Sequence, residues 1–427
     1  MINLSPIHNS ILSHWAQSWI LLLLISTSVA PSRADSWSVY GSVSLETEYS
    51  DNKRLVTNNQ DAGLQSIADL EVVAARENRN NSITARIDAE AVRYSSIDIL
   101  DDEDNALLNV TGRHEASRRV ELGWYGQYAL ETTTNRDPRL RTQVDENSGF
   151  DVDTALTREQ FRTREFSGGP NISLKLTENL SVDASYQYTE VDFPERASTP
   201  AFGFFDFDQH VAQLGASYAL NPRHSVSLVA RGSQFDSVGL FGDEVSGFVA
   251  SDVDTDTIAG VLGYRFDLAK NLYLGANVGF EDVDTSTGFG DFDLDRTELV
   301  YRLFANLQGR SSRLLVSIGR SIAPSGIGRL LRSDLLRIVY RYRLSARQSL
   351  QFRASYLSNE PLGVFLDVLD RELLSIEPTY RYDVNRQLSL SLSYRYRTRE
   401  LRAEGAETDN HAVSARLRYQ FGRPNSQ

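Results

Sequence analysis

The chain has 427 residues, with 44 Lys and Arg against 57 Asp and Glu, which gives a formal net charge of −13. This acidity argues against a nucleic-acid partner. The sequence contains no cysteine, which excludes disulfides, thiolate metal sites, cysteine nucleophiles and lipoprotein anchoring. After residue 35 no apolar run reaches the roughly 18 residues that a transmembrane helix needs, so a helical membrane protein is excluded.

The chain begins with a segment that is typical of a secretory signal peptide. Residues 19–25 form a compact apolar run, and Ser32, Arg33 and Ala34 follow it. Cleavage after Ala34 satisfies the small-residue preference of signal peptidase, although no Lys or Arg precedes the apolar run as the usual pattern requires. The sequence therefore predicts a signal peptide over residues 1–34 and a single domain over residues 35–427.

From about residue 37 to residue 421, apolar and polar residues alternate with a period of two. This period indicates β-strands that have one apolar face and one polar face. The clearest example is LSLSLSYRYR at residues 388–397. Similar runs follow short turns at residues 180–188, 272–280 and 350–356, and mirror-image runs lead into such turns at residues 258–266, 336–342 and 376–382.

Short polar connections alternate with long ones along this pattern. About eight short and nine long connections imply about 18 strands, with a range of 16–18. This even number places both termini on the short-turn side. A soluble β-propeller is the alternative, but a blade needs four strands per repeat and this chain has room for two. The sequence predicts an all-β fold, a single transmembrane antiparallel up-and-down β-barrel. The short connections lie near residues 77–81, 115–118, 177–179, 221–223, 269–271, 310–312, 345–348 and 383–386.

Aromatic residues on the apolar face gather at the strand ends, with Leu, Val and Ala between them. Amphipathic rings prefer the headgroup level of a bilayer, so two aromatic belts predict an exterior that contacts outer-membrane lipid and lipopolysaccharide. The last strand, residues 411–421, resembles the C-terminal signal that the barrel-assembly machinery recognises, although six residues follow Phe421. The belt beside the short turns contains Tyr218, Tyr264, Phe266, Tyr340, Tyr342, Tyr380, Tyr382, Tyr419 and Phe421, and the belt beside the long loops contains Tyr128, Tyr186, Tyr188, Phe280, Tyr356, Tyr394 and Tyr396.

The polar face is expected to line the lumen as two charged walls. The basic wall consists of Arg302, Arg337, Arg341, Arg343, Arg353, Arg381, Arg395, Arg397, Arg416 and Arg418. The acidic wall consists of Glu46, Glu48, Asp69, Glu71, Asp88, Glu90, Glu121 and Asp183. Opposed walls would produce a transverse field across a water-filled pore, and the alternative is that they only solvate a wide barrel. The arginines also suit an anionic polymer, because guanidinium groups match carboxylates and sulfates bidentately.

Several loops are candidate functional segments. The longest connection, residues 132–160, is the third long loop, which either folds inward and constricts the pore or remains at the surface. The acidic loops 98–104, 252–256 and 282–295 have D-x-D spacings, but a calcium loop starting at Asp291 would need Gly and Glu where the chain has Arg296 and Arg302. Solvated loops, or loops that bridge divalent ions to lipopolysaccharide, are the better interpretation.

The sequence offers no enzyme constellation. His8 and His14 precede the predicted cleavage site, His114 and His224 lie near short turns, and His210 and His411 begin strands on the lipid-facing register; these are the six histidines. None has a serine or aspartate partner on the inward register, and no cofactor motif or metal-ligand spacing occurs. We therefore expect a protein that is not an enzyme and binds no cofactor.

Hairpin units such as LSLSLSYRYRTRELRAEGAETDNHAVSARLRYQF and NLYLGANVGFEDVD resemble those of the β-barrel porin 2 family, outer-membrane β-barrels associated with exopolysaccharide gene clusters. The resemblance spans most of the mature chain but rests on general barrel patterning. It implies a porin-like outer-membrane pore, or an accessory protein, that serves export of surface polysaccharide or exopolysaccharide. The alternatives are a structural or adhesive outer-membrane barrel without transport and an outer-membrane barrel enzyme.

Overall fold

The computed structural model describes residues 37–53, 55, 62–95, 100–132, 162–194, 206–243, 247–287, 294–325, 329–362, 371–401 and 406–422. The predicted signal peptide over residues 1–34 therefore lies outside the described residues. No helix in the described ranges is long and apolar enough to cross a membrane.

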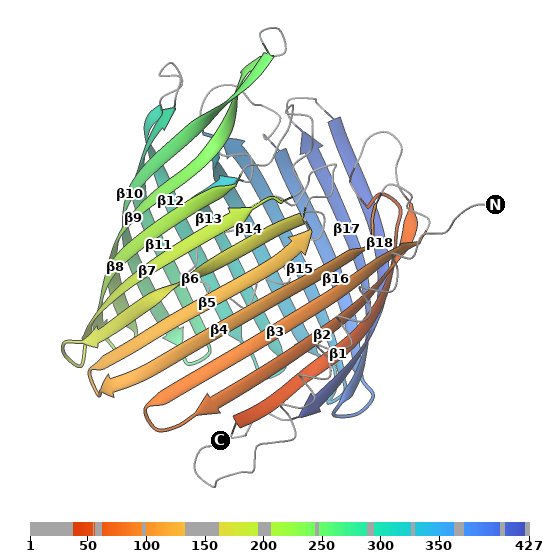
Figure 1. Ribbon diagram of the computed structural model, residues 1–427. Coiled ribbons are helices and arrows are strands. Elements are labelled where there is room, and N and C mark those ends of the chain that lie inside the picture. The colour runs from red at the N-terminus through yellow and green to blue at the C-terminus, as the bar shows by residue number, and fades with distance from the viewer. Residues whose placement is uncertain are drawn as a thin grey trace.

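Eighteen antiparallel strands form one closed barrel (Figure 1). The first nine are β1 (Trp37–Ser50), β2 (Gly63–Glu77), β3 (Asn81–Ser95), β4 (Glu103–Ser117), β5 (Val120–Thr132), β6 (Arg162–Lys175), β7 (Leu180–Asp192), β8 (Phe207–Asn221) and β9 (His224–Asp243). The second nine are β10 (Gly247–Ala269), β11 (Leu272–Thr287), β12 (Leu294–Gln308), β13 (Ser312–Ser325), β14 (Arg329–Arg343), β15 (Gln348–Pro361), β16 (Arg371–Asp383), β17 (Leu388–Leu401) and β18 (Ala406–Gly422).

Each strand pairs with its neighbours in chain order, and β1 pairs with both β2 and β18, which closes the barrel. This confirms the predicted all-β fold and the strand number. The eight short turns lie within a few residues of their predicted positions; in the first of them, the backbone amide of Asn78 donates to the carbonyl of Asn81. Because Trp37 pairs with Arg76 and Tyr40 pairs with Gly422, β1 begins and β18 ends on the short-turn side.

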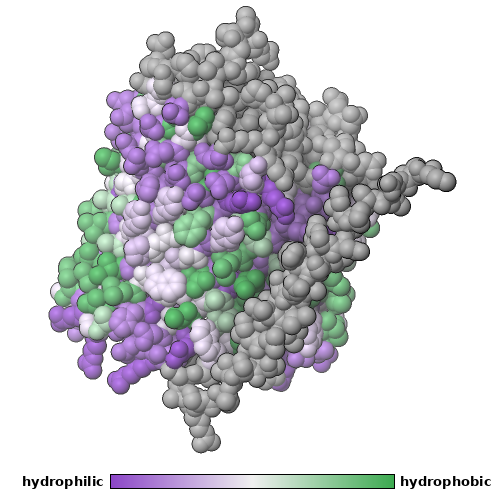
Figure 2. Space-filling model, viewed as in Figure 1, coloured by the Kyte–Doolittle hydropathy of each residue, from purple (hydrophilic) through white to green (hydrophobic). Residues whose placement is uncertain are grey.

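The two faces of each strand differ as the period-two pattern predicts. On β1, Leu45 is 60% exposed, whereas the side chains of Glu46 and Glu48, which point the other way, are buried. Large exposed apolar residues recur at outward positions on every part of the wall, and Figure 2 shows hydrophobic residues across its middle with hydrophilic residues toward both rims. An apolar outer band around a polar interior is the arrangement of a barrel that lies in lipid.

At both rims of the outer wall, tyrosine hydroxyls form hydrogen bonds with histidine side chains. Tyr186 and Tyr394 are exposed beside the long loops, and their hydroxyls contact Nδ1 of His210 at 2.6 Å and of His411 at 2.7 Å. Beside the short turns, the Tyr264 hydroxyl contacts Nδ1 of His224 at 2.5 Å. Rings with a polar group at the edge of the apolar band are typical of the two interfaces of a membrane protein.

Candidate functional site: the lumen face

The lumen is the candidate site because it gathers most of the buried polar residues of the barrel. The register places every arginine of the predicted basic wall and every carboxylate of the predicted acidic wall on the inward positions of its strand. The basic residues lie on β12 and on β14 to β18, and the acidic residues on β1, β2, β3, β5 and β7.

Barrel closure places part of the two predicted walls side by side rather than opposite one another. Glu46 lies directly across from Arg416, because β1 pairs with β18. Arg416 forms ion pairs with Glu46 and, at 3.5 Å, with Asp69, and Arg418 lies 3.0 Å from Glu71. The prediction of two opposed walls is therefore wrong for this part of the lumen, where β1, β2, β17 and β18 form one neutralised surface, called here the closure seam.

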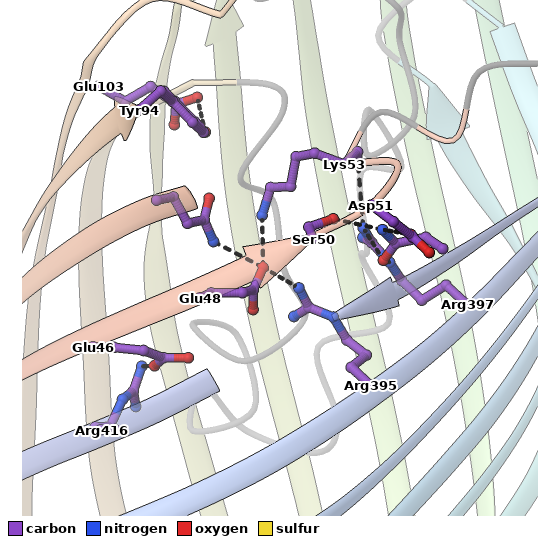
Figure 3. Close-up of polar contacts among 12 residues, drawn as sticks. Glu46, Glu48, Ser50, Asp51, Lys53, Tyr94, Glu103, Arg395, Arg397 and Arg416 are labelled. Atoms are coloured by element: carbon purple, nitrogen blue, oxygen red, sulfur yellow. Dashed lines mark hydrogen bonds and ion pairs between the residues drawn. The ribbon is translucent and has the colours of Figure 1, made fainter. Parts of the chain in front are cut away.

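The closure seam also holds the beginning of the first long loop inside the barrel. Lys53 Nζ and Arg395 both point toward Glu48, at 3.3 Å and 2.6 Å from Oε1 (Figure 3). Arg397 donates to the backbone carbonyl of Lys53 at 3.1 Å, and Arg399 donates to the carbonyl of Leu55. The side chain of Leu55 is completely buried, and its φ of 52° lies in the left-handed region that ordinary residues avoid.

Residues 51–53 and Leu55 are therefore anchored over the lumen face of β17 and β18. Asn52 adds a hydrogen bond to the carbonyl of Asp409 at 2.9 Å. Burial lowers the pKa of Lys53, the adjacent Glu48 opposes this shift, and Arg395 and Arg397 add to it. Residues 132–160, the loop for which the sequence left inward folding and a surface position open, lie outside the described residues apart from Thr132.

On β13–β16 the arginines face a different environment, called here the arginine cluster: Arg313, Arg341, Arg353 and Arg381. Arg313 and Arg341 lie directly across from each other, and both are exposed toward the interior beside the short turns. Arg341 donates to the side-chain oxygen of Gln351 at 2.9 Å, and the charges of Arg353, Arg381 and Arg313 all act on it. Opposed like charges are destabilising, so this surface favours an anion.

Two members of the cluster do have carboxylate partners. Arg353 lies 2.9 Å from Glu377, and Arg381 lies 2.8 Å from Asp383. The positive charge is thus concentrated at Arg313 and Arg341, at the short-turn end of the lumen. Arginine at such a surface binds carboxylates, sulfates and phosphates through two parallel hydrogen bonds.

The remaining predicted acidic residues lie on the wall formed by β3, β5 and β7. Asp88 is paired with Arg86 at 2.7 Å, Glu121 with Arg113 at 2.7 Å, and Glu90 accepts a hydrogen bond from Asn105 at 3.0 Å. Asp183 is exposed to the interior. Arginines on β3 and β4 thus neutralise part of the acidic wall.

The sequence pattern did not single out several other lumen groups. Arg231 contacts the buried Glu281 at 2.6 Å, and Thr257 donates to the same carboxylate at 3.1 Å. Glu298 lies directly across from Glu281 and is also buried. Glu281 could have been found by extending the alternation of residues 272–280 one position further, since it has the parity of the inward residues.

At the long-loop end of the barrel, one side of the lumen is apolar. Val191, Phe207, Phe235, Val283 and Val300 occupy inward positions on β7, β8, β9, β11 and β12, and all are buried. They form one cluster with Phe193, Ile322, Leu330 and Leu362, called here the mouth cluster. The long-loop end of the lumen is thus apolar on the side of β7 to β14, whereas the closure seam carries charged residues there.

The closed barrel, its apolar outer band and its interfacial aromatic residues define an outer-membrane β-barrel with a charged interior. No protein-family model matches the chain, and no curated protein matches it. The resemblance to the β-barrel porin 2 family therefore remains a prediction.

Solved structures with a similar fold are outer-membrane porins and receptors. OpdO from Pseudomonas aeruginosa is 14% identical, with a TM-score of 0.46, over 90% of this chain and 97% of that chain. A BenF-like porin from Pseudomonas fluorescens is 11% identical, with a TM-score of 0.47, over 91% of this chain and 99% of that chain. The ferric-catecholate import receptor Fiu from E. coli is 8% identical, with a TM-score of 0.42, over 89% of this chain and 81% of that chain. Likenesses this distant do not transfer a function, which is inferred below from the residues of this barrel.

Proposed function

We propose that the protein is a porin-like channel that passes anionic solutes across the outer membrane, with anionic surface polysaccharide or exopolysaccharide as its principal cargo. The arginine cluster carries this proposal, because Arg313 and Arg341 are exposed to the interior and directly opposed. A barrel of 16–18 strands generally leaves an aqueous channel, so the 18 strands of this one give an anion room to approach the cluster. The resemblance to the β-barrel porin 2 family supports polysaccharide as the cargo.

The test is single-channel conductance of the refolded chain 35–427 in a planar bilayer. Reversal potentials in a salt gradient should show anion selectivity, and an acidic polysaccharide added on the short-turn side should block the current. A neutral dextran of the same length is the matched control, and it should block much less. Stable steps that acidic polymer leaves unblocked would limit the function to a general anion porin. Cation selectivity would contradict the proposal.

A second candidate is a structural or adhesive barrel without transport. The mouth cluster favours it, because nine buried apolar residues pack together at the long-loop end of the barrel, on one side of the lumen. A verified folded barrel that stays electrically silent under all conditions would support this candidate.

We also propose two classes of partner for the exterior. The outer aromatic and apolar surface contacts outer-membrane lipid and lipopolysaccharide. The last strand is read by the barrel-assembly machinery, and substituting Tyr419 and Phe421 with alanine should reduce the fraction of chains that reach the membrane without preventing refolding in detergent. Unchanged membrane yield would contradict this second proposal.

A further inference from the structure

The strands β7 and β17 repeat one pattern of residues. Residues 180–190 read LSVDASYQYTE and residues 388–398 read LSLSLSYRYRT, so each strand has Leu-Ser after a short turn and Tyr-x-Tyr toward the long loop. The strands that pair with them, β8 and β18, both carry Asp-x-His, at residues 208–210 and 409–411. The same side chains therefore recur in two hairpins of one barrel.

The two hairpins also share their register and geometry. Tyr188 lies directly across from His210, and Tyr396 lies directly across from His411. The ring centroids of these pairs are 5.0 Å and 5.1 Å apart, and both interplanar angles are 39°. The first tyrosine of each Tyr-x-Tyr places its hydroxyl 2.6 Å or 2.7 Å from Nδ1 of the same histidine. Each histidine is thus held between two tyrosines in the same orientation.

Each hairpin adds a carboxylate on the long-loop side of the histidine. In the first hairpin the Tyr188 hydroxyl donates to Asp208 at 2.9 Å, and in the second Asp409 lies 3.8 Å from Nε2 of His411. These groups lie on the outward register, and the first tyrosine of each Tyr-x-Tyr is 41% exposed. Both hairpins therefore present an aromatic ring, an imidazole and a carboxylate together on the outer wall.

A third pair of histidine and tyrosine, on the short-turn rim, has a different setting. His224 lies 2.5 Å from the Tyr264 hydroxyl and stacks on Phe266 at 4.6 Å. The two residues before His224 are Pro222 and Arg223, where the other two histidines have Asp-x. Of these three pairs, the two with a carboxylate are on the long-loop rim. In a bacterial barrel that rim faces the outer leaflet.

We propose that the β7–β8 and β17–β18 hairpins are two binding sites for a sugar of the glycolipid headgroups in the outer leaflet. The C–H face of a sugar ring packs on the exposed tyrosine ring, because the face of an aromatic ring is partly negative. The carboxylate accepts hydrogen bonds from sugar hydroxyls, and the imidazole exchanges a further one. The two hairpins lie on different sides of the closed ring of strands, so each binds its own glycolipid (Figure 1). This rests on the lipopolysaccharide contact proposed above and narrows it to two places.

Bound glycolipid can be counted by native mass spectrometry of the refolded chain 35–427 in an amine-oxide detergent, which carries no sugar. With rough lipopolysaccharide as the probe, the parent should retain two molecules tightly. Tyr186→Ala with His210→Ala should remove one, and Tyr394→Ala with His411→Ala should remove the other. Lipopolysaccharide retained equally by the parent and by the folded combined variant would refute the two sites and leave the general contact of the outer wall standing.

The third pair is the matched control. Tyr264→Ala with His224→Ala removes the same two residue types from the short-turn rim and should leave both lipopolysaccharide molecules bound. Phosphatidylglycerol is the second probe, and the parent and the combined variant should bind it alike. Loss of lipopolysaccharide in the control, or equal loss of both lipids in the combined variant, would overturn the assignment to a sugar.

A second measurement needs no substitution at the sites. Residues 35–427 contain four of the six histidines, so a protein labelled with ¹³C at histidine Cε1 gives four NMR signals. Rough lipopolysaccharide should shift the signals of His210 and His411 and leave those of His114 and His224 in place. The free core oligosaccharide of the same glycolipid should cause the same shifts at higher concentration. Shifts at all four histidines, at none, or with the intact lipid alone would contradict the proposal.

Discussion

The closure seam and the arginine cluster contain the same residue type on the same lumen-facing register, yet their electrostatics are opposite. In the seam, Arg416 contacts Glu46 and Asp69, whereas in the cluster Arg341 faces Arg313. The difference arises from which strands are neighbours. The first and last strands pair, so the acidic β1 and β2 neutralise the basic β18, whereas β13 to β16 adjoin strands that are themselves basic. The ion pairs of the seam hold the first and last strands together, whereas the arginines of the cluster concentrate positive charge.

The largest effect is expected in the seam, at a buried charge. Substituting Glu48→Gln removes the carboxylate that Lys53 and Arg395 share and leaves buried positive charge without compensation. Removing one partner of a buried pair costs about 3–5 kcal/mol, so the urea midpoint for unfolding from liposomes should fall clearly. The double variant Glu48→Gln with Arg395→Gln should recover part of the loss. If the Glu48→Gln variant unfolds at the same urea midpoint as the parent protein, the ion pairs of the seam do not stabilise the barrel.

The next effect concerns selectivity rather than stability. Substituting Arg341→Glu should move the reversal potential toward cations and lower the affinity for acidic polysaccharide, while the urea midpoint changes little, because one opposed like charge is also relieved. The matched comparison, at an equal change of charge, is Arg341→Gln against Arg416→Gln, because Arg416 is already paired with Glu46 and Asp69. If both substitutions shift the reversal potential equally, the distinction between seam and cluster is wrong.

The sequence predicts the wall of this barrel better than its interior. Strand number, turns and inward parity follow from local alternation, which is why Glu46 and Arg416 could each be assigned to the polar face. That these two residues touch depends on the pairing of β1 with β18, which no local pattern contains. Ile322 shows the same limit, because its parity indicates the lipid face but the side chain packs in the mouth cluster.

A smaller effect is expected from pH at the anchored loop. Lys53 has a lowered pKa because it is buried, so the unfolded chain binds more protons than the folded one and stability rises with pH. The penalty applies below the lowered pKa and disappears as the pH rises through it toward the ordinary lysine value. Docking of residues 51–53, followed as resistance to protease cleavage, should therefore strengthen as the pH rises. The variant Lys53→Met should lose this dependence, and a parent protein with a flat profile would contradict the burial argument.

The smallest effect is expected on the outer wall beyond the aromatic belt, where like charges are opposed as they are in the arginine cluster. Glu190, Asp208, Asp236 and Asp254 lie directly across from one another on β7 to β10. The pKa of Asp236 is raised by burial and by Asp254, so protonation favours the folded state and stability should increase as the pH falls through the raised pKa. At neutral pH, Asp254→Asn should stabilise the barrel by about 0.2–1 kcal/mol, because it removes a directly opposed like charge. The shift in urea midpoint should vanish below the raised pKa of Asp236, where the charge opposite residue 254 is lost. If the shift in urea midpoint persists at that pH, the gain in stability comes from packing and not from charge. The four opposed carboxylates on the outer wall would then not destabilise the barrel, unlike the opposed arginines of the cluster in the lumen.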